Sequence, residues 1–211
     1  KRKLKIMNEG YISVLNDISS DAPTPGGGTV AALTLCHANA LALMVSRLTV
    51  GKEKWAKGHT IAKEIIIFSN QSIEKSLSLA KEDAEAFSLV MEAYRLPKSD
   101  EEERKIRDQT ILTATIGAAD TPLSIAKEAH KLLSQLPDLA RYGNSNAITD
   151  LASSSELAYT AVYIASLNVK INVDSMDSED LDIIQEASTN ILLNSKEIIE
   201  EIRLIVAERM R

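Results

Sequence analysis

An aspartate at position 83 lies where a carboxylate can do acid–base chemistry. At about 100° per residue, the apolar residues around it form one stripe along a helix, made of Leu79, Ala80, Phe87, Val90 and Tyr94. Asp83 falls in the middle of this stripe, whereas Glu85 falls almost opposite. Desolvation raises the pKa of a carboxyl group, and a raised pKa suits a general acid near neutral pH. Asp83 is therefore the best candidate for catalysis, although a buried aspartate bonded to a helix terminus or an arginine fits the pattern equally well.

The second candidate region is a glycine block, Gly26, Gly27 and Gly28, preceded by Pro23 and Pro25. Prolines keep the approach out of helical conformation, and glycines allow the backbone to come close to another group. Thr29 is then expected to cap a helix that begins there. A helix start of this kind can bind an anionic or polar ligand, or it can be a tight packing corner.

Several polar residues near expected helix ends are further candidates for substrate binding. These are Pro25 beside the glycines, and Thr49, Lys52, Arg95, Lys98, Asn144 and Asp150. Each also has a structural interpretation. Lys52 can complement a helix dipole, Asn144 and Asp150 can cap a helix, and Arg95 and Lys98 can either complement a dipole or meet an anionic substrate.

Histidines and cysteine give no metal-site pattern. Cys36 is the single cysteine, so an internal disulfide and a multi-cysteine metal site are excluded. The histidines at 37, 59 and 130 lie on separate segments without metal-ligand spacing. His37 and Asn39 fall in the most apolar segment, where hydrogen-bonded core residues are favoured over ligands. A reducing, cytoplasmic setting is the expectation.

Composition fits a soluble globular domain. The chain has 211 residues, of which 45% are hydrophobic and 26% charged, and its net charge of −6 argues against general nucleic-acid binding. Residues 22–46 carry no formal charge, which raises the question of a membrane span. The prolines, glycines and polar residues in this run favour a buried central helix instead.

Apolar periodicity predicts helices throughout. They cover about 4–18, 29–49, 62–96, 101–119, a segment with Pro122 in its first turn that reaches 133, 146–168 and 180–210. Pro137 marks a break and 141–144 a loop. Residues 168–173 alternate as a strand does, but one strand cannot make a sheet. The prediction is one all-α domain over 1–211, a multi-helix bundle with a central apolar helix.

The order of these motifs resembles the formimidoyltetrahydrofolate cyclodeaminase family, which includes standalone methenyltetrahydrofolate cyclohydrolases. The matching segments are PTPGGGTVAA at 23–32, residues 44–45, LTVGK at 48–52, DAEAF at 83–87, AYRLPK at 93–98, Gly143 with Asn144, Asp150 and NVKIN at 168–172. This resemblance spans about residues 5–180. It implies an all-helical homodimer that binds folate in a cleft, with Asp83 as the proton donor.

The resemblance implies that 5-formimidoyltetrahydrofolate cyclises to 5,10-methenyltetrahydrofolate with release of ammonia. This chemistry needs no metal or redox cofactor, and the glycine block, Lys52, Arg95 or Lys98 is expected to receive the anionic folate tail. The 211 residues contain no formiminotransferase domain, which strengthens the alternative of a methenyltetrahydrofolate cyclohydrolase. A non-catalytic helical dimer that binds folate or a protein is the third possibility. No nucleic-acid or membrane partner is expected.

Overall fold

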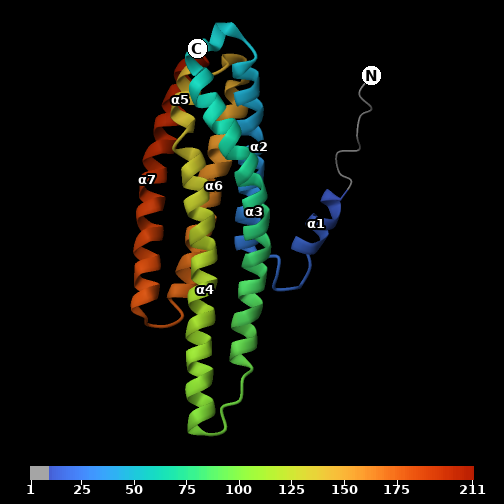
Figure 1. Ribbon diagram of the computed structural model, residues 1–211, viewed down its shortest axis with the longest axis vertical. Helices are drawn as coiled ribbons and strands as arrows, with labels where there is room; N and C mark the ends of the chain where they lie inside the picture. The colour runs from blue at the N-terminus through green and yellow to red at the C-terminus, as the bar shows by residue number, and fades with distance from the viewer. Residues whose placement is uncertain (1–9) are drawn as a thin grey trace.

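Helices form every regular element in the computed structural model, which describes residues 10–211. In chain order (Figure 1) they are α1 (Tyr11–Ile18), α2 (Gly27–Val50), the 3-10 turn η1 (Glu53–Gly58), α3 (His59–Tyr94), α4 (Glu101–Leu133), α5 (Leu136–Tyr142), η2 (Ser145–Ala147), α6 (Ile148–Val173) and α7 (Glu179–Arg209). The prediction of an all-α domain is confirmed. The predicted helical residues from Leu4 onward to position 9 lie outside the described part of the chain.

The structure corrects the expected break near Pro122, because α4 continues through it from Glu101 to Leu133. A proline inside a helix has no N–H to donate to the carbonyl four residues earlier, here that of Ala118. Asn172 of α6 supplies the missing donor, with its Nδ2 2.9 Å from Ala118 O. A contact between two helices thus satisfies the carbonyl that Pro122 leaves free, and the helix does not need to end.

Two further helix boundaries differ from the prediction. Residues 168–173, with their strand-like alternation, are the last turns of α6. Val169 is fully buried in a cluster with Ala119 and Leu123 of α4, whereas Ile171 is 71% exposed. Helix α2 begins at Gly27 with Gly26 as its N-cap, so Thr29 lies inside the first turn and does not cap the helix.

Helix α2 is rich in small residues and packs mainly against α3 and α6. Its alanines at 31, 32, 38 and 42 are fully buried, which lets the neighbouring helices approach closely. Among residues 10–211, α2 is the one helix long and apolar enough to cross a membrane, and 56% of its most apolar window is buried inside the bundle. Such burial is typical of the core helix of a globular protein.

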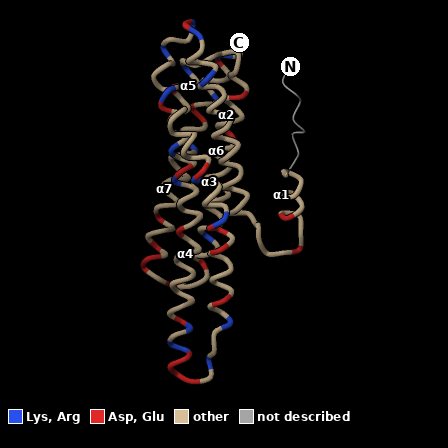
Figure 2. Tube along the Cα trace, turned by 45° about the vertical axis from the view of Figure 1, so that its right-hand side comes forward, with Lys and Arg blue, Asp and Glu red and all other residues tan. Residues whose placement is uncertain are grey.

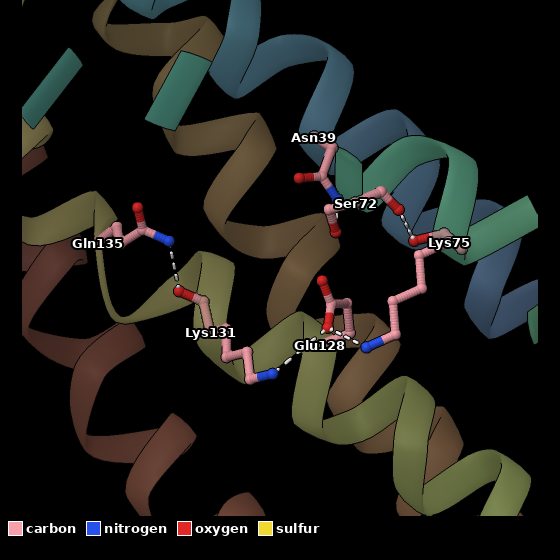
Figure 3. Close-up of polar contacts among 7 residues, drawn as sticks. Asn39, Ser72, Lys75, Glu128, Lys131 and Gln135 are labelled. Carbon is pink, nitrogen blue, oxygen red and sulfur yellow. Dashed lines mark hydrogen bonds and ion pairs between the residues drawn. The ribbon is translucent and has the colours of Figure 1, made fainter. Parts of the chain in front are cut away.

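Polar side chains join α2 to α3 and α3 to α4 (Figure 3). Buried Glu128 of α4 accepts from Lys75 Nζ of α3 at 2.9 Å, and Lys131 Nζ lies 3.7 Å from the same oxygen. Asn39 of α2 is fully buried and donates to Ser72 Oγ of α3 at 3.1 Å. The predicted core role of Asn39 is therefore confirmed.

His37 differs from that expectation, because it is exposed on the surface of α2. Its Nδ1 lies 2.8 Å from Leu33 O of the same helix, and its ring meets Tyr11 of α1 edge-on with centroids 6.0 Å apart. His37 therefore helps to hold α1 and is not a core residue. The periodicity of α2 could not show this, since apolar residues surround the helix on nearly all sides.

The lower halves of α3 and α4 extend as a hairpin beyond the ends of α6 and α7 (Figure 1). Both signs of charge occur along this extension (Figure 2). The loop at its tip begins after Tyr94, and Asp100 caps α4 by accepting from the N–H of Glu103 at 2.8 Å. The hairpin also exposes large apolar side chains, among them Phe87, Leu89 and Ile106.

Candidate active site

A cavity of about 340 Å³ lies where the start of α2 meets α3, α4 and the end of α6. It is lined by Pro23, Thr24, Gly26, Gly27, Gly28, Asp83, Phe87, Val90, Ala118, Asn168, Ile171 and Asn172. The glycine block and the candidate catalytic aspartate are far apart in sequence, and the fold brings them to one site. The cavity has one carboxylate, two amides, the hydroxyl of Thr24, the backbone of the glycine block and several apolar side chains.

Asp83 is half-buried and faces this cavity from α3. Thr29 Oγ1 donates a hydrogen bond to Asp83 Oδ2 at 3.0 Å. Burial raises the pKa of the Asp83 carboxyl, and hydrogen bonding from the side chain and the backbone of Thr29 partly offsets this rise. Asp83 therefore contacts a helix terminus, as its structural interpretation expects. It also lines a cavity and has a raised pKa, as a general acid requires, and its catalytic role stays a prediction.

Gly28 explains how the carboxyl comes so close to the first turn of α2. A Cβ at position 28 would lie 2.6 Å from Asp83 Cγ, a distance that real Cβ atoms essentially never show. Any side chain there would displace the carboxyl group. Of the two interpretations of the glycine block, a tight packing corner is the one that applies at Gly28, and the group packed there is the Asp83 carboxyl.

The apolar stripe around Asp83 is only partly buried. Leu79 and Ala80 are 5% and 8% exposed, whereas Phe87 and Tyr94, further along α3, are 38% and 46% exposed. Asp83 therefore lies where α3 leaves the bundle and enters the projecting hairpin. Phe87 and Val90 provide an apolar wall of the cavity next to the carboxyl.

Pro25, Arg95 and Lys98 have different positions relative to this cavity. Pro25 is in the segment that leads into Gly26, with the neighbouring Pro23, Thr24 and Gly26 lining the cavity. Arg95 is the C-cap of α3 and Lys98 follows in the loop at the tip of the hairpin. At about 1.5 Å per residue, Arg95 lies roughly 18 Å along α3 from Asp83.

Thr49, Lys52, Asn144 and Asp150 lie at the other end of α2, which is about 36 Å long at 1.5 Å per residue. Thr49 Oγ1 accepts from the N–H of Asn144 at 3.0 Å, and Asn144 Nδ2 donates to Leu48 O at 3.2 Å. The Asn144 side chain also caps η2. Asp150 is in the first turn of α6. Within one chain, these four residues do not meet Asp83.

The sequence prediction missed several residues that line the cavity, above all Asn168 and Asn172. The spacing of these two residues in the sequence could have indicated them, because two asparagines four residues apart lie on one face of a helix. The strand-like alternation of residues 168–173 obscured it. Among residues 10–211, no three His, Cys, Asp or Glu side chains gather into a group that could hold a metal ion.

Known proteins are similar to this chain over most of its length. Residues 11–199 match the family model described as formiminotransferase-cyclodeaminase. A methenyltetrahydrofolate cyclohydrolase from Methylorubrum extorquens is 34% identical over 170 residues, which is 81% of this chain and 82% of that protein. A formimidoyltransferase-cyclodeaminase from Gallus gallus is 32% identical over 162 residues, or 77% of this chain and 30% of that longer protein.

A solved structure is also similar over its whole length. The crystal structure of a formiminotetrahydrofolate cyclodeaminase from Thermotoga maritima has a TM-score of 0.77 and 26% sequence identity to this chain. The match covers 98% of this chain and 96% of that one. The two folds are thus similar over nearly all of both chains.

Proposed function

The chain belongs to the formiminotransferase-cyclodeaminase family of folate one-carbon enzymes, and from this premise we propose that it converts 5-formimidoyltetrahydrofolate to 5,10-methenyltetrahydrofolate and ammonia. In this proposal Asp83 is the proton donor. The observation that carries it is the half-buried Asp83 carboxyl, which faces the cavity with a raised pKa.

The reaction defines what Asp83 has to do. N10 attacks the formimidoyl carbon, the new C–N10 bond forms, and the electron pair of the C=N bond moves to the imino nitrogen. This nitrogen needs two further protons to leave as ammonia. One proton can come from N10 and the other from Asp83, whose raised pKa keeps it protonated to higher pH than an ordinary aspartate.

The same carboxyl also suits the product. When ammonia leaves, the carbon between N5 and N10 becomes part of a positively charged methenyl bridge. Asp83 has by then lost its proton, so a carboxylate faces the developing positive charge and stabilises it. The half-buried position strengthens this attraction, because fewer water molecules screen it.

A methenyltetrahydrofolate cyclohydrolase is the second candidate, and a specific comparison favours it. The Methylorubrum extorquens relative has this name and is matched over 82% of its length. In that reaction water adds to the methenyl carbon, the C–N5 bond breaks as the hydroxyl proton of the adduct passes to N5, and 10-formyltetrahydrofolate forms. Asp83 as a carboxylate would take a proton from the attacking water.

The deciding experiment offers the purified protein each substrate separately and compares it with Asp83→Asn. We expect ammonia release from the formimidoyl compound, a loss of about 100-fold or more in turnover for the variant, and an unchanged helical content. Hydrolysis of the methenyl compound without ammonia release from the other would establish the cyclohydrolase. If the wild-type protein turns over neither substrate, or if Asp83→Asn retains full activity, the proposed role of Asp83 is wrong.

Asp83→Asn is also expected to leave the fold at least as stable at neutral pH. The pKa of the folded carboxyl is raised, so the stability it contributes is fully present below its unfolded pKa and is lost as pH rises through the folded pKa. Asparagine does not titrate and can still accept from Thr29. Thermal denaturation at pH 7 therefore separates lost chemistry from lost folding.

The folate tail is proposed to run from the cavity toward Arg95 and Lys98 at the tip of the hairpin. Asp83 is the one charged residue among the described residues that line the cavity, so the cavity itself offers no cation to an anionic tail. Arg95 and Lys98 are at the tip of the same helix pair, and they fit this role better than the backbone of the glycine block. A cytoplasmic location suits the free thiol of Cys36.

We also propose that the chain forms a homodimer. Leu89 and Ile106 on the hairpin are each 57% exposed, and Met91 and Tyr94 are 39% and 46% exposed. Large apolar side chains gathered on one projection are typical of a protein interface. A second copy would also give Lys52 and Asp150 a route to substrate, since they are far from Asp83 of their own chain. Thr49 and Asn144, which are buried and bonded to each other, would support that end of α2.

A further inference from the structure

The end of α6 contributes two amide side chains to the cavity, Asn168 and Asn172, one helical turn apart. Both are partly buried. The proposed proton transfer uses neither of them. Their chemistry depends on which amide atom is free to meet a ligand.

Hydrogen bonds fix the orientation of both amides. Asn168 Nδ2 donates to Ile164 O at 2.8 Å. Asn172 Nδ2 donates to Ala118 O at 2.9 Å and to Asn168 O at 2.8 Å. All three partners are carbonyl oxygens, which only accept hydrogen bonds. A rotated amide would place oxygen against oxygen, so the orientation of each amide is fixed and its Oδ1 can accept from a ligand. Asn172 uses both N–H groups of Nδ2 in these bonds, whereas Asn168 uses one.

The Ala118 carbonyl is a further reason for the orientation of the Asn172 amide. Pro122 cannot donate to that carbonyl, so Asn172 is its donor across the helix interface. At the other position, Gly27 lies beside the amide of Asn168, since a Cβ on Gly27 would be in van der Waals contact with Asn168 Nδ2 at 3.4 Å. The start of α2 and the end of α6 are thus neighbours at the cavity.

Both asparagines and Asp83 thus present oxygen atoms to the same cavity. No lysine or arginine lines it among the described residues, and Lys170 of the same helix turn is exposed and paired with Asp174 at 2.9 Å. Apolar Phe87, Val90 and Ile171 complete the walls. The cavity also contains the Thr24 hydroxyl and the backbone of the glycine block at the start of α2. Its α6 and α3 side instead offers side-chain acceptors between apolar walls, which suits a flat group with N–H donors.

We propose that Asn168 and Asn172 recognise the N–H donors of the aminopyrimidinone ring of the folate. This inference rests on the proposed function, because it takes the folate as substrate. The ring carries an exocyclic amine and ring N–H groups, which match acceptor oxygens, and its flat faces match the apolar walls. The ring end of the substrate therefore lies against α6, next to Asp83, and the anionic tail points out of the cavity.

The test is a cycle of two ligands and three proteins. The ligands are tetrahydrofolate and its analogue with a methyl group in place of the exocyclic amine. The proteins are wild type, Asn168→Ala and the matched control Asn70→Ala. Asn70 of α3 makes the same bond to the carbonyl four residues earlier, Ile66 O at 2.7 Å, but lies outside the cavity lining. Calorimetry gives each dissociation constant, and circular dichroism checks the fold.

We expect wild type and Asn70→Ala to bind tetrahydrofolate about 10-fold or more tightly than the analogue, because an unpaired buried acceptor costs affinity. Asn168→Ala should lose most of this preference and bind the methyl analogue about as well as wild type does. Equal binding of both ligands by wild type, or an equal loss for both ligands in Asn168→Ala, would overturn the assignment. Failure of wild type to bind either ligand would instead overturn the proposed function.

Discussion

At the scale of single residues, Asp83 owes its properties to two neighbours in the first turn of α2. Gly28 has no side chain and lets the carboxyl reach the helix start. Thr29 then donates to the carboxyl at 3.0 Å. Burial favours the protonated form of Asp83, and the bonds from Thr29 favour the carboxylate. This balance keeps the proton transferable, because the group can both donate a proton and remain stable without it.

Thr29 is therefore expected to set the pH range of the reaction. As pH rises through the raised pKa of Asp83, the proton donor is lost and kcat/KM for the formimidoyl substrate falls. Thr29→Val removes a bond that stabilises the carboxylate, so the pKa rises further and the fall shifts to higher pH. Thr29→Ser keeps the hydroxyl and should follow wild type. Identical pH profiles for all three proteins would contradict this role.

The site residues differ in how far the sequence could predict them. Helical periodicity predicts Asp83 as a candidate, because it shows a carboxylate on an apolar face without knowledge of any other helix. Asn168 and Asn172 depend on tertiary contacts, since Asn172 gains its role from Ala118 and Pro122 of a different helix. The same limit applies to Thr49 and Asn144. Their mutual bond, 95 positions apart in sequence, holds a loop against the end of α2.

At the scale of the elements, the sequence predicts correctly that the elements are helices, but it does not predict where a helix continues past a local break signal. Pro122 is a strong local signal for a helix start. The expected break was wrong, because the Asn172 side chain of α6 donates to the Ala118 carbonyl that Pro122 leaves free. Residues 168–173 alternate locally as a strand does, yet the packing of Val169 keeps them helical. Tertiary contacts therefore override local signals at the two places where α4 and α6 border the candidate site.

The ion pair between α3 and α4 gives a prediction about helix packing. Glu128 is 5% exposed and depends on Lys75 at 2.9 Å, with Lys131 more distant at 3.7 Å (Figure 3). Lys75→Met leaves this buried carboxylate with its weaker partner, which is expected to lower the free energy of unfolding by about 1–2 kcal/mol. Denaturant titration measures the change.

Lys81 provides the matched control for this pair, because its bond to Glu85 at 3.4 Å joins two exposed residues of the same helix. Lys81→Met should change stability far less, since exposed pairs contribute little. Adding Glu128→Met to Lys75→Met should restore part of the loss by removing the buried charge. Equal effects of Lys75→Met and Lys81→Met would show that Glu128 is solvated and that the pair does not hold the helices.

At the scale of the whole molecule, the predicted site residues form two groups at opposite ends of α2. Gly26, Gly27, Gly28 and Asp83 meet at the start of the helix, whereas Thr49, Lys52, Asn144 and Asp150 lie about 36 Å away at its end, at 1.5 Å per residue. One chain cannot bring both groups to one substrate. In a symmetric dimer each chain can give one group to each of two sites.

Complementation between inactive variants tests whether both groups serve one site. Asp83→Asn and Lys52→Met are each expected to be impaired as homodimers. Unfolding and refolding them together in equal amounts makes mixed dimers, and one of the two sites in a mixed dimer has both Asp83 and Lys52 intact. Recovery of about a quarter of the wild-type sites is expected from random pairing. Native mass spectrometry confirms that mixed dimers form; if they form without recovered activity, Lys52 does not reach the site of the second chain.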